Sequence, residues 1–374
     1  MSKEWFKRVY VYTKPFMLMI FLQTSYAVGS LIIKSALNKG LNHYTFAVYR
    51  NSFAALTFGP FAFFIERKLR PKMTISIFLK IMLLGLLEPV IDQNLFYAGM
   101  KLTTATFAAA MCNIVPAIAF IMAWIFRLEM VKMKSLHSQG KMIGTLVTVG
   151  GAMIMTLVRG PVIQFPWTNH QTLQHQTSAN TVTTQDQIKG SLMITVGCFC
   201  WASFVILQAH TLKSYPVELS LTTLVCMMGA LEGSVLAVVA ERAKASIWSI
   251  NWDIKLFAAI YSGIMCSGFA YYISGVVMQE RGPVFVTAFN PLAMVIIVIL
   301  GSFVLAEKLN LGSVVGAVVI VVGLYMVLWG KSKDQIQQNQ DQDQDQKSSM
   351  DHQHEDIKKT VDTCEKPSTD LESV

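Results

Sequence analysis

Charged residues are scarce in this sequence. They make up 14% of its 374 residues, whereas an ordinary soluble domain carries about 25%. Hydrophobic residues make up 53%, and they gather in runs long enough to cross a bilayer, which takes about 20 residues. This composition excludes an ordinary soluble protein and predicts an all-α, polytopic membrane protein.

Other residue patterns are also missing. All but one of the 6 cysteines fall inside apolar runs, so we expect no disulfide framework and no metal site. The 7 histidines fall in loops, in the tail or at the ends of apolar runs. A catalytic cluster at one membrane face is therefore not expected, and we predict neither enzymatic activity nor a cofactor. No Asn-x-Ser/Thr sequon occurs, so outer loops should carry no N-glycan.

Ten apolar runs predict ten transmembrane helices. The runs cover residues 15–34, 44–65, 79–100, 104–126, 140–158, 190–210, 217–240, 255–278, 283–305 and 311–329. Residues 1–14 precede the first run, which has no small-residue cleavage site and is expected to be a signal anchor. The tail, 330–374, is rich in Asp and Gln and cannot bury a core, so we expect it to be disordered.

The sequence repeats itself. A shift of 175 residues aligns it on itself without a gap from Tyr26 to Pro116. Among the residues that this shift superposes are Tyr26 on Trp201, Glu66 on Glu241, Tyr97 on Tyr272, and Pro116 on Pro291. Further on, Gly140, Gly144 and Gly151 match Gly312, Gly316 and Gly323 with identical spacing.

Each copy of the repeat contains five apolar runs. Because five is odd, the second copy must enter the membrane upside down relative to the first. We therefore predict two inverted five-helix repeats, 15–158 and 190–329, joined by a polar extracytoplasmic linker, 159–189. An inverted repeat of this kind is typical of secondary transporters, whose substrate path lies at the repeat interface.

The net charge of +8 could indicate a nucleic-acid partner, but its distribution argues against one. If the N-terminus is cytoplasmic, lysines and arginines in the inner segments outnumber those in the outer segments nearly two to one. This is the positive-inside bias of membrane proteins. It predicts that both termini lie in the cytoplasm, that lipid surrounds the chain and that no nucleic acid binds.

Three ionisable residues lie well inside the second and third runs, away from the ends of those runs. At 1.5 Å per residue, Arg50, Asp92 and Glu88 lie about 9, 12 and 18 Å below the outer boundary. Glu88 and Asp92 are four residues apart, which places them on one face of an α-helix. One interpretation is a cavity that binds a zwitterion; the other is a structural ion pair between Arg50 and Asp92.

Glu88 is followed by Pro89, which removes a helical hydrogen bond and opens the backbone near the midplane. Glu88 is therefore a candidate substrate or proton site, or else a protonated core group. The repeat places Gly263 at the equivalent position, so Glu88 is specialised to one copy. Glu232 lies at a similar depth in the seventh run and is a further candidate.

Asn-Pro features mark equivalent places in the fourth and ninth runs. They are Asn113 with Pro116, and Asn290 with Pro291. Prolines at matched positions predict two helix interruptions near the midplane, where transporters bind their substrates. The alternative is a pair of plain proline kinks.

Aromatic residues also recur at matched positions. Trp201 and Tyr26 fall near the midplane, where they either stack on a substrate or fill the core. Tyr97 and Tyr272 fall near opposite faces, where they either gate the path or anchor the helices. The Gly140-x-x-x-Gly144 and Gly312-x-x-x-Gly316 patterns predict close packing between the fifth and tenth helices.

Three segments closely resemble a known family: Leu87–Tyr97, Thr104–Pro116 and Arg281–Leu292. They are similar to the plant nodulin-21-like transporters, also called usually-multiple-acids-move-in-and-out or WAT1-related proteins. These belong to the drug/metabolite transporter superfamily, which has two EamA repeats. The resemblance covers residues 8–333.

This resemblance implies transport of amino acids, seen mainly as export, by a protein of the plant plasma membrane. The alternative is an auxin or other organic-acid carrier, as in some relatives at the vacuole. For an amino acid, Arg50 would bind the carboxylate and Glu88 or Asp92 the amino group, with hydrogen bonds from Asn113 and Asn290. The oligomeric state and the energy source stay open.

Overall fold

The computed structural model describes residues 2–103, 111–126, 128, 136–157, 162–163, 184–241, 248, 252–304, 309–312 and 314–330. The fold is all-helical, as predicted, apart from one antiparallel pair of two-residue strands, β1 (Val162–Ile163) and β2 (Leu309–Asn310). Most of the predicted linker and nearly all of the predicted tail lie outside the described residues.

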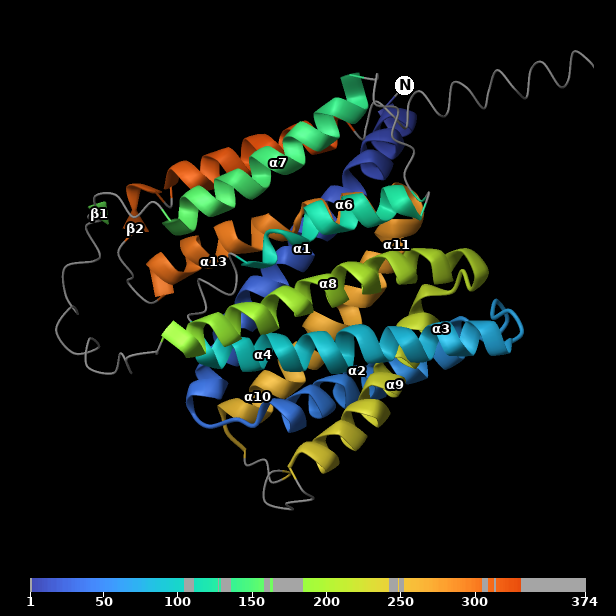
Figure 1. Cartoon of the computed structure of the whole chain (residues 1–374). Helices are drawn as coiled ribbons and strands as arrows, with labels where there is room; N and C mark the ends of the chain where they lie inside the picture. The colour runs from blue at the N-terminus through green and yellow to red at the C-terminus, as the bar shows by residue number, and fades with distance from the viewer. Residues whose placement is uncertain are drawn as a thin grey trace, which may run out of the picture.

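The helices occupy the apolar runs (Figure 1). In the first half they are α1 (Ser2–Asn38), α2 (His43–Ile65), α3 (Ile75–Gly85), η1 (Leu86–Asp92), α4 (Gln93–Leu102), α6 (Val115–Ile125) and α7 (Leu136–Leu157). In the second half they are α8 (Thr184–Ser214), α9 (Glu218–Ala240), α10 (Ile254–Tyr261), η3 (Ser262–Phe269), α11 (Ala270–Arg281), α12 (Pro283–Ala288) and α13 (Asn290–Val304), followed by the helix Val314–Gly330.

The chain is an integral membrane protein. Within the described residues, 4 helices are long and apolar enough to cross a bilayer: Thr13–Asn38, Ile188–Ser214, Glu218–Ala240 and Ile254–Arg281. Large apolar side chains such as Leu56, Phe64 and Val235 lie exposed on the outer faces of the helices. Exposed apolar surface on this scale is expected where lipid, and not water, is the solvent.

Two segments of π-helix interrupt the α-helices: η1 lies between α3 and α4, and η3 lies between α10 and α11. The π-helix η1 contains Pro89, whose missing N–H disturbs the α-helical pattern. The π-helix η3 contains no proline but holds Gly263 and Gly268. A Cβ on Gly263 would lie 2.5 Å from the backbone oxygen of Arg50, so α2 can pass here only because this residue is glycine.

The predicted helix interruptions at the two Asn-Pro features are confirmed. Asn113 and Ile114 form a turn before α6, which begins at Val115. In the second half, α12 ends at Ala288, Phe289 forms a turn, and α13 begins at Asn290.

The predicted packing of the fifth helix against the tenth is also confirmed. In Figure 1, α7 and the helix Val314–Gly330 run side by side at one edge of the molecule. A Cβ on Gly144 would lie 2.7 Å from the backbone nitrogen of Val327 and 2.8 Å from the oxygen of Gly323. The absence of a side chain at Gly144 therefore sets how closely the two helices approach.

We expect Gly144→Ala to lower the stability of the detergent-solubilised protein by about 1–3 kcal/mol, because the new methyl group meets backbone atoms that cannot yield. Gly150→Ala on the same helix is the matched control, since nothing lies within 4 Å of its added Cβ. Thermal unfolding followed by tryptophan fluorescence measures both. Equal melting temperatures for the two variants would contradict the packing role of Gly144.

Candidate functional site

Arg50 is the centre of the buried polar groups. Its side chain is almost fully buried on α2, with 7% exposed. The guanidinium donates hydrogen bonds to the Ser267 hydroxyl (2.7 Å), the Cys266 carbonyl (2.8 Å) and the Tyr97 hydroxyl (2.5 Å). It also forms an ion pair with Glu88, with 4.0 Å between Nη2 and Oε1. One cation on α2 therefore connects η1, η3 and α4.

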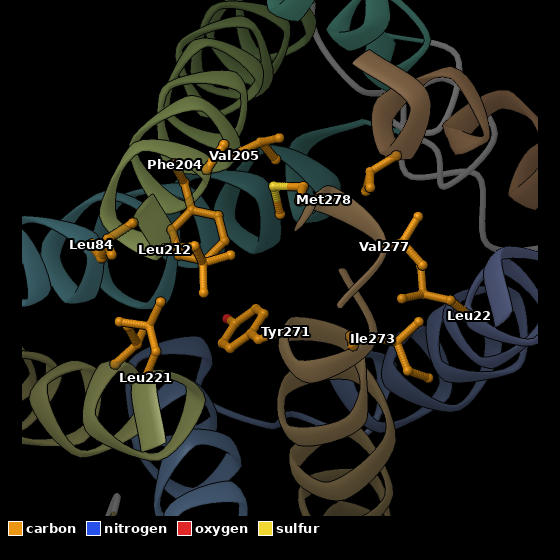
Figure 2. Packing of buried hydrophobic residues seen from close by; sticks show 14 of the residues in the cluster. Leu22, Leu84, Phe204, Val205, Leu212, Leu221, Tyr271, Ile273, Val277 and Met278 are labelled. Atoms are coloured by element: carbon orange, nitrogen blue, oxygen red, sulfur yellow. The ribbon is translucent and has the colours of Figure 1, made fainter. Parts of the chain in front are cut away.

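Glu88 is 3% exposed and is held by two neutral donors. The Tyr271 hydroxyl donates to its Oε2. The Gln93 side-chain amide donates to both oxygens, at 3.2 and 3.0 Å. Figure 2 shows Tyr271 among Phe204 and Leu221 of the apolar core. In such surroundings an unpaired carboxylate would be costly, so these donors are needed to hold the charge.

The π-helix corrects one sequence-based expectation. We expected Glu88 and Asp92 to share a helix face, on the α-helical spacing of four. In η1 the backbone N–H of Gln93 donates to the carbonyl of Glu88, a step of five residues. This wider turn puts Gln93, and not Asp92, beside Glu88. The ion pair of Arg50 is accordingly made with Glu88 and not with Asp92.

Asp92 instead faces α8. A Cβ on Gly197 would lie 2.7 Å from its Oδ1, so the carboxylate sits against the α8 backbone. It makes no hydrogen bond with another described residue, although the charges of Glu88 and Arg50 still reach it. Asp92 is thus the less constrained of the two carboxylates.

Glu232 on α9 lies apart from this group. Its Oε2 is buried without a hydrogen-bond partner among the described residues, and no ion pair joins it to Arg50 in that part of the chain. The structure therefore does not bring Glu232 together with the other candidates.

Tyr26 on α1 borders the same group. Its hydroxyl is buried and has no hydrogen-bond partner among the described residues, yet it lies within the electrostatic field of Glu88 and Arg50. Its ring meets Trp201 edge to face at 6.4 Å between ring centroids. Trp201 in turn stacks on Phe204 at 5.7 Å. Trp201 thus packs within the core, and the Tyr26 hydroxyl has no hydrogen-bond partner among the described residues.

Asn113 and Asn290 gather near α13. The Asn113 amide donates to the Met294 sulfur at 3.0 Å. Asn290 lies one turn earlier on α13 and accepts a hydrogen bond from Gln23 of α1 at 3.5 Å. Gln23 precedes Tyr26 by about one turn of α1. The polar residues Asn290, Gln23 and Tyr26 therefore lead from α13 toward Arg50 and Glu88.

The remaining candidates have local roles. Pro116 and Pro291 occupy the first turns of α6 and α13, where the missing N–H costs nothing. Tyr97, expected near a membrane face, is buried and bonded to Arg50. Tyr272 is half-buried and packs against Phe58 and its apolar neighbours. Within the described residues, no group of three or more His, Cys, Asp and Glu could hold a metal ion.

Sequence reasoning missed Gln93, Ser267 and Tyr271. Gln93 could have been found only by expecting a π turn at Pro89. Ser267 and Tyr271 lie in the other half of the sequence, and no spacing rule links them to Arg50. Together with Arg50 and Glu88, these residues form a buried site with one cation, one carboxylate and several hydroxyl and amide groups.

Comparisons with known proteins agree with this architecture. The EamA-like transporter family matches the chain twice, over residues 13–157 and 188–329. Two WAT1-related proteins of Arabidopsis thaliana are 59% and 54% identical over 322 and 321 residues. These matches cover 86% of this chain, and 86% and 84% of the relatives. A protein of known crystal structure, 13% identical, shares the fold with a TM-score of 0.59 over 84% of this chain and 95% of its own.

We expect Arg50→Ala to destabilise the solubilised protein by about 3–5 kcal/mol, because it leaves the buried Glu88 carboxylate without a cation. The matched control is Lys14→Ala. It removes an ion pair to Glu280 at 3.5 Å whose two side chains are 39% and 42% exposed, so it should cost less than about 1 kcal/mol. Thermal unfolding in detergent compares them. An Arg50→Ala variant as stable as Lys14→Ala would contradict the structural role of the buried pair.

Proposed function

The chain belongs to the EamA-like transporter family, and from this premise we propose that it is a secondary transporter that carries amino acids across a membrane, mainly as export. The single observation that carries the choice of substrate is the buried pair of Arg50 and Glu88. An amino acid zwitterion bears the same two opposite charges. It can therefore replace the internal ion pair with two new ones and leave no charge buried alone.

In this proposal Arg50 binds the substrate carboxylate and Glu88 the ammonium group. Arginine suits the first task because its planar guanidinium matches a carboxylate with two hydrogen bonds. Asp92 is the second acidic group that an ammonium can reach, since it has no hydrogen-bond partner of its own among the described residues. The Tyr26 hydroxyl, also without a described partner, supplies a further hydrogen bond.

Asn113 and Asn290 extend the proposed path toward α13. Both side chains are already close to partners on neighbouring helices, and both stand at helix interruptions. Interrupted helices expose backbone groups that can bind a polar substrate within the membrane.

We further propose ten transmembrane helices arranged as two inverted repeats, 15–158 and 190–329. The two matches to the same family support this arrangement. So does the placement of η1 and η3, which fall at equivalent places of the two copies, as do the interruptions before α6 and α13.

The site would then lie where the two repeats meet. Arg50 and Glu88 belong to the first copy, while Cys266, Ser267 and Tyr271 belong to the second. A rocking motion between the copies would change these contacts and expose the site to one side and then the other. With the positive-inside bias, both termini lie in the cytoplasm, and we propose the plasma membrane as the location.

The test is efflux of a labelled amino-acid mixture from oocytes or yeast that express this chain. We expect export above vector-injected or vector-transformed cells. Glu88→Gln should lower it by about tenfold or more, because a neutral amide cannot replace a charged partner of the ammonium group. Glu280→Gln is the matched control, since that carboxylate is exposed and outside the site, and its flux should equal that of the unmodified chain.

All variants are compared at equal surface abundance, measured by surface biotinylation. Export that Glu88→Gln leaves unchanged would refute the assignment of the site. Verified surface protein that moves no amino acid in either direction would refute the cargo, and labelled auxin at the plasma or vacuolar membrane is then the next substrate.

A further inference from the structure

The helices α2 and α9 are joined at one end by Glu66. This residue follows α2, and its carboxylate is buried. It accepts hydrogen bonds from the backbone N–H groups of Leu219 (3.1 Å) and Ser220 (2.6 Å) and from the Ser220 hydroxyl (2.5 Å). Leu219 and Ser220 belong to the first turn of α9, whose N–H groups have no partners within their own helix. Arg70 donates to the Ser220 hydroxyl at 2.8 Å and reinforces this end.

Glu241 joins the same two helices at the other end. It follows α9 and accepts a hydrogen bond from the Asn42 side-chain amide at 2.6 Å. Asn42 is the N-cap of α2, and its Oδ1 accepts from the backbone N–H groups of Tyr44 and Thr45. Each helix thus ends in a glutamate that stabilises the first turn of the other.

The two ends are equivalent under the sequence repeat. The shift that places Glu66 on Glu241 also places Asn42 on Val217. Valine has no side-chain oxygen, and α9 accordingly has no N-cap hydrogen bond from Val217. Glu66 therefore binds the α9 backbone directly, whereas Glu241 acts on α2 through Asn42.

Between these ends α2 and α9 pack against each other in antiparallel directions. A Cβ on Gly233 would lie 3.4 Å from Cγ2 of Val48, and a Cβ on Gly59 would lie 3.7 Å from Cγ2 of Thr223. These are ordinary contacts, the first toward the Asn42 end and the second toward the Glu66 end. The two helices are therefore in contact toward both of their ends.

We propose that α2 and α9 stay locked together throughout transport and form the fixed axis about which the two halves rock. The inference rests on the proposed function. A pair of helices that gates the path must part at one membrane face. Parting at the Glu66 end would leave a buried carboxylate and two backbone N–H groups without partners. A pair tied by a glutamate at both ends instead holds the two copies together while other helices move.

Disulfide trapping tests the axis directly. Two cysteine pairs are made, Val48→Cys with Gly233→Cys and Gly59→Cys with Thr223→Cys. In each pair a Cβ at the glycine position lies near the partner's Cγ2, at 3.4 and 3.7 Å, and a cysteine sulfur can take the place of that γ-carbon, so a disulfide needs only a small shift of the side chains. Each pair is oxidised in membranes with copper phenanthroline, and amino-acid efflux is measured before and after. The single-cysteine variants, treated alike, control for oxidation of the native cysteines.

If the axis is locked, amino-acid efflux by either cross-linked protein should stay within about twofold of efflux by the same protein in its reduced form. A covalent bond between helices that never part does not restrict the transport motion. Loss of flux on cross-linking at either end, restored by reductant, would overturn the proposal. Reduced protein that moves no amino acid points to the wrong cargo and not to the wrong axis.

Hydrogen exchange provides a measurement that does not depend on the cargo. In the solubilised full chain, the amides of Leu219 and Ser220 at one end, and of Tyr44 and Thr45 at the other, should exchange as slowly as amides in the middle of α2. A pair that opens at one face would expose one of these sets. Fast exchange at either end would therefore also overturn the axis.

Discussion

The buried pair of Arg50 and Glu88 is the constraint on which the centre of this structure depends. The lipid of a membrane supplies no partner for such charges, so while the site is closed each must find its partners within the protein. Arg50 is satisfied by Glu88, Tyr97, Ser267 and the Cys266 carbonyl. Glu88 requires two further donors, from Gln93 and Tyr271. The need to satisfy two charges thus ties η1, η3, α2, α4 and α11 into one polar core within an otherwise apolar bundle.

The same pair explains why the second half of the chain has no carboxylate at the position equivalent to Glu88. The position of Glu88 corresponds to Gly263 in the second half, and there the backbone of Arg50 passes so closely that no side chain fits. A carboxylate can therefore stand in only one of the two copies. The site is asymmetric because the helix that carries its cation occupies the place that a second acid would need.

The apolar runs predicted the positions of the helices, since lipid demands long apolar segments and few other patterns meet that demand. Local rules also predicted the breaks at Asn113 and Asn290 and the close approach at Gly144. The partner of Arg50 was not predictable in this way. Depth along ideal α-helices placed Asp92 level with Arg50, whereas Arg50 pairs with Glu88 and the π turn at Pro89 puts Gln93 beside Glu88. Tyr271 and Ser267 come from distant sequence, and only the assembled fold brings them to the site.

The missing cap at Val217 has a consequence for how the chain is made. The α2 helix carries its own N-cap in Asn42 and is locally complete when it leaves the ribosome. The α9 helix is not, because the oxygen atoms that satisfy its first turn belong to Glu66, about 150 residues upstream. Synthesis proceeds from the N-terminus, so the carboxylate that accepts these hydrogen bonds has already been made when α9 emerges. The first turn of α9 is thus completed only when the second half of the chain packs against the first.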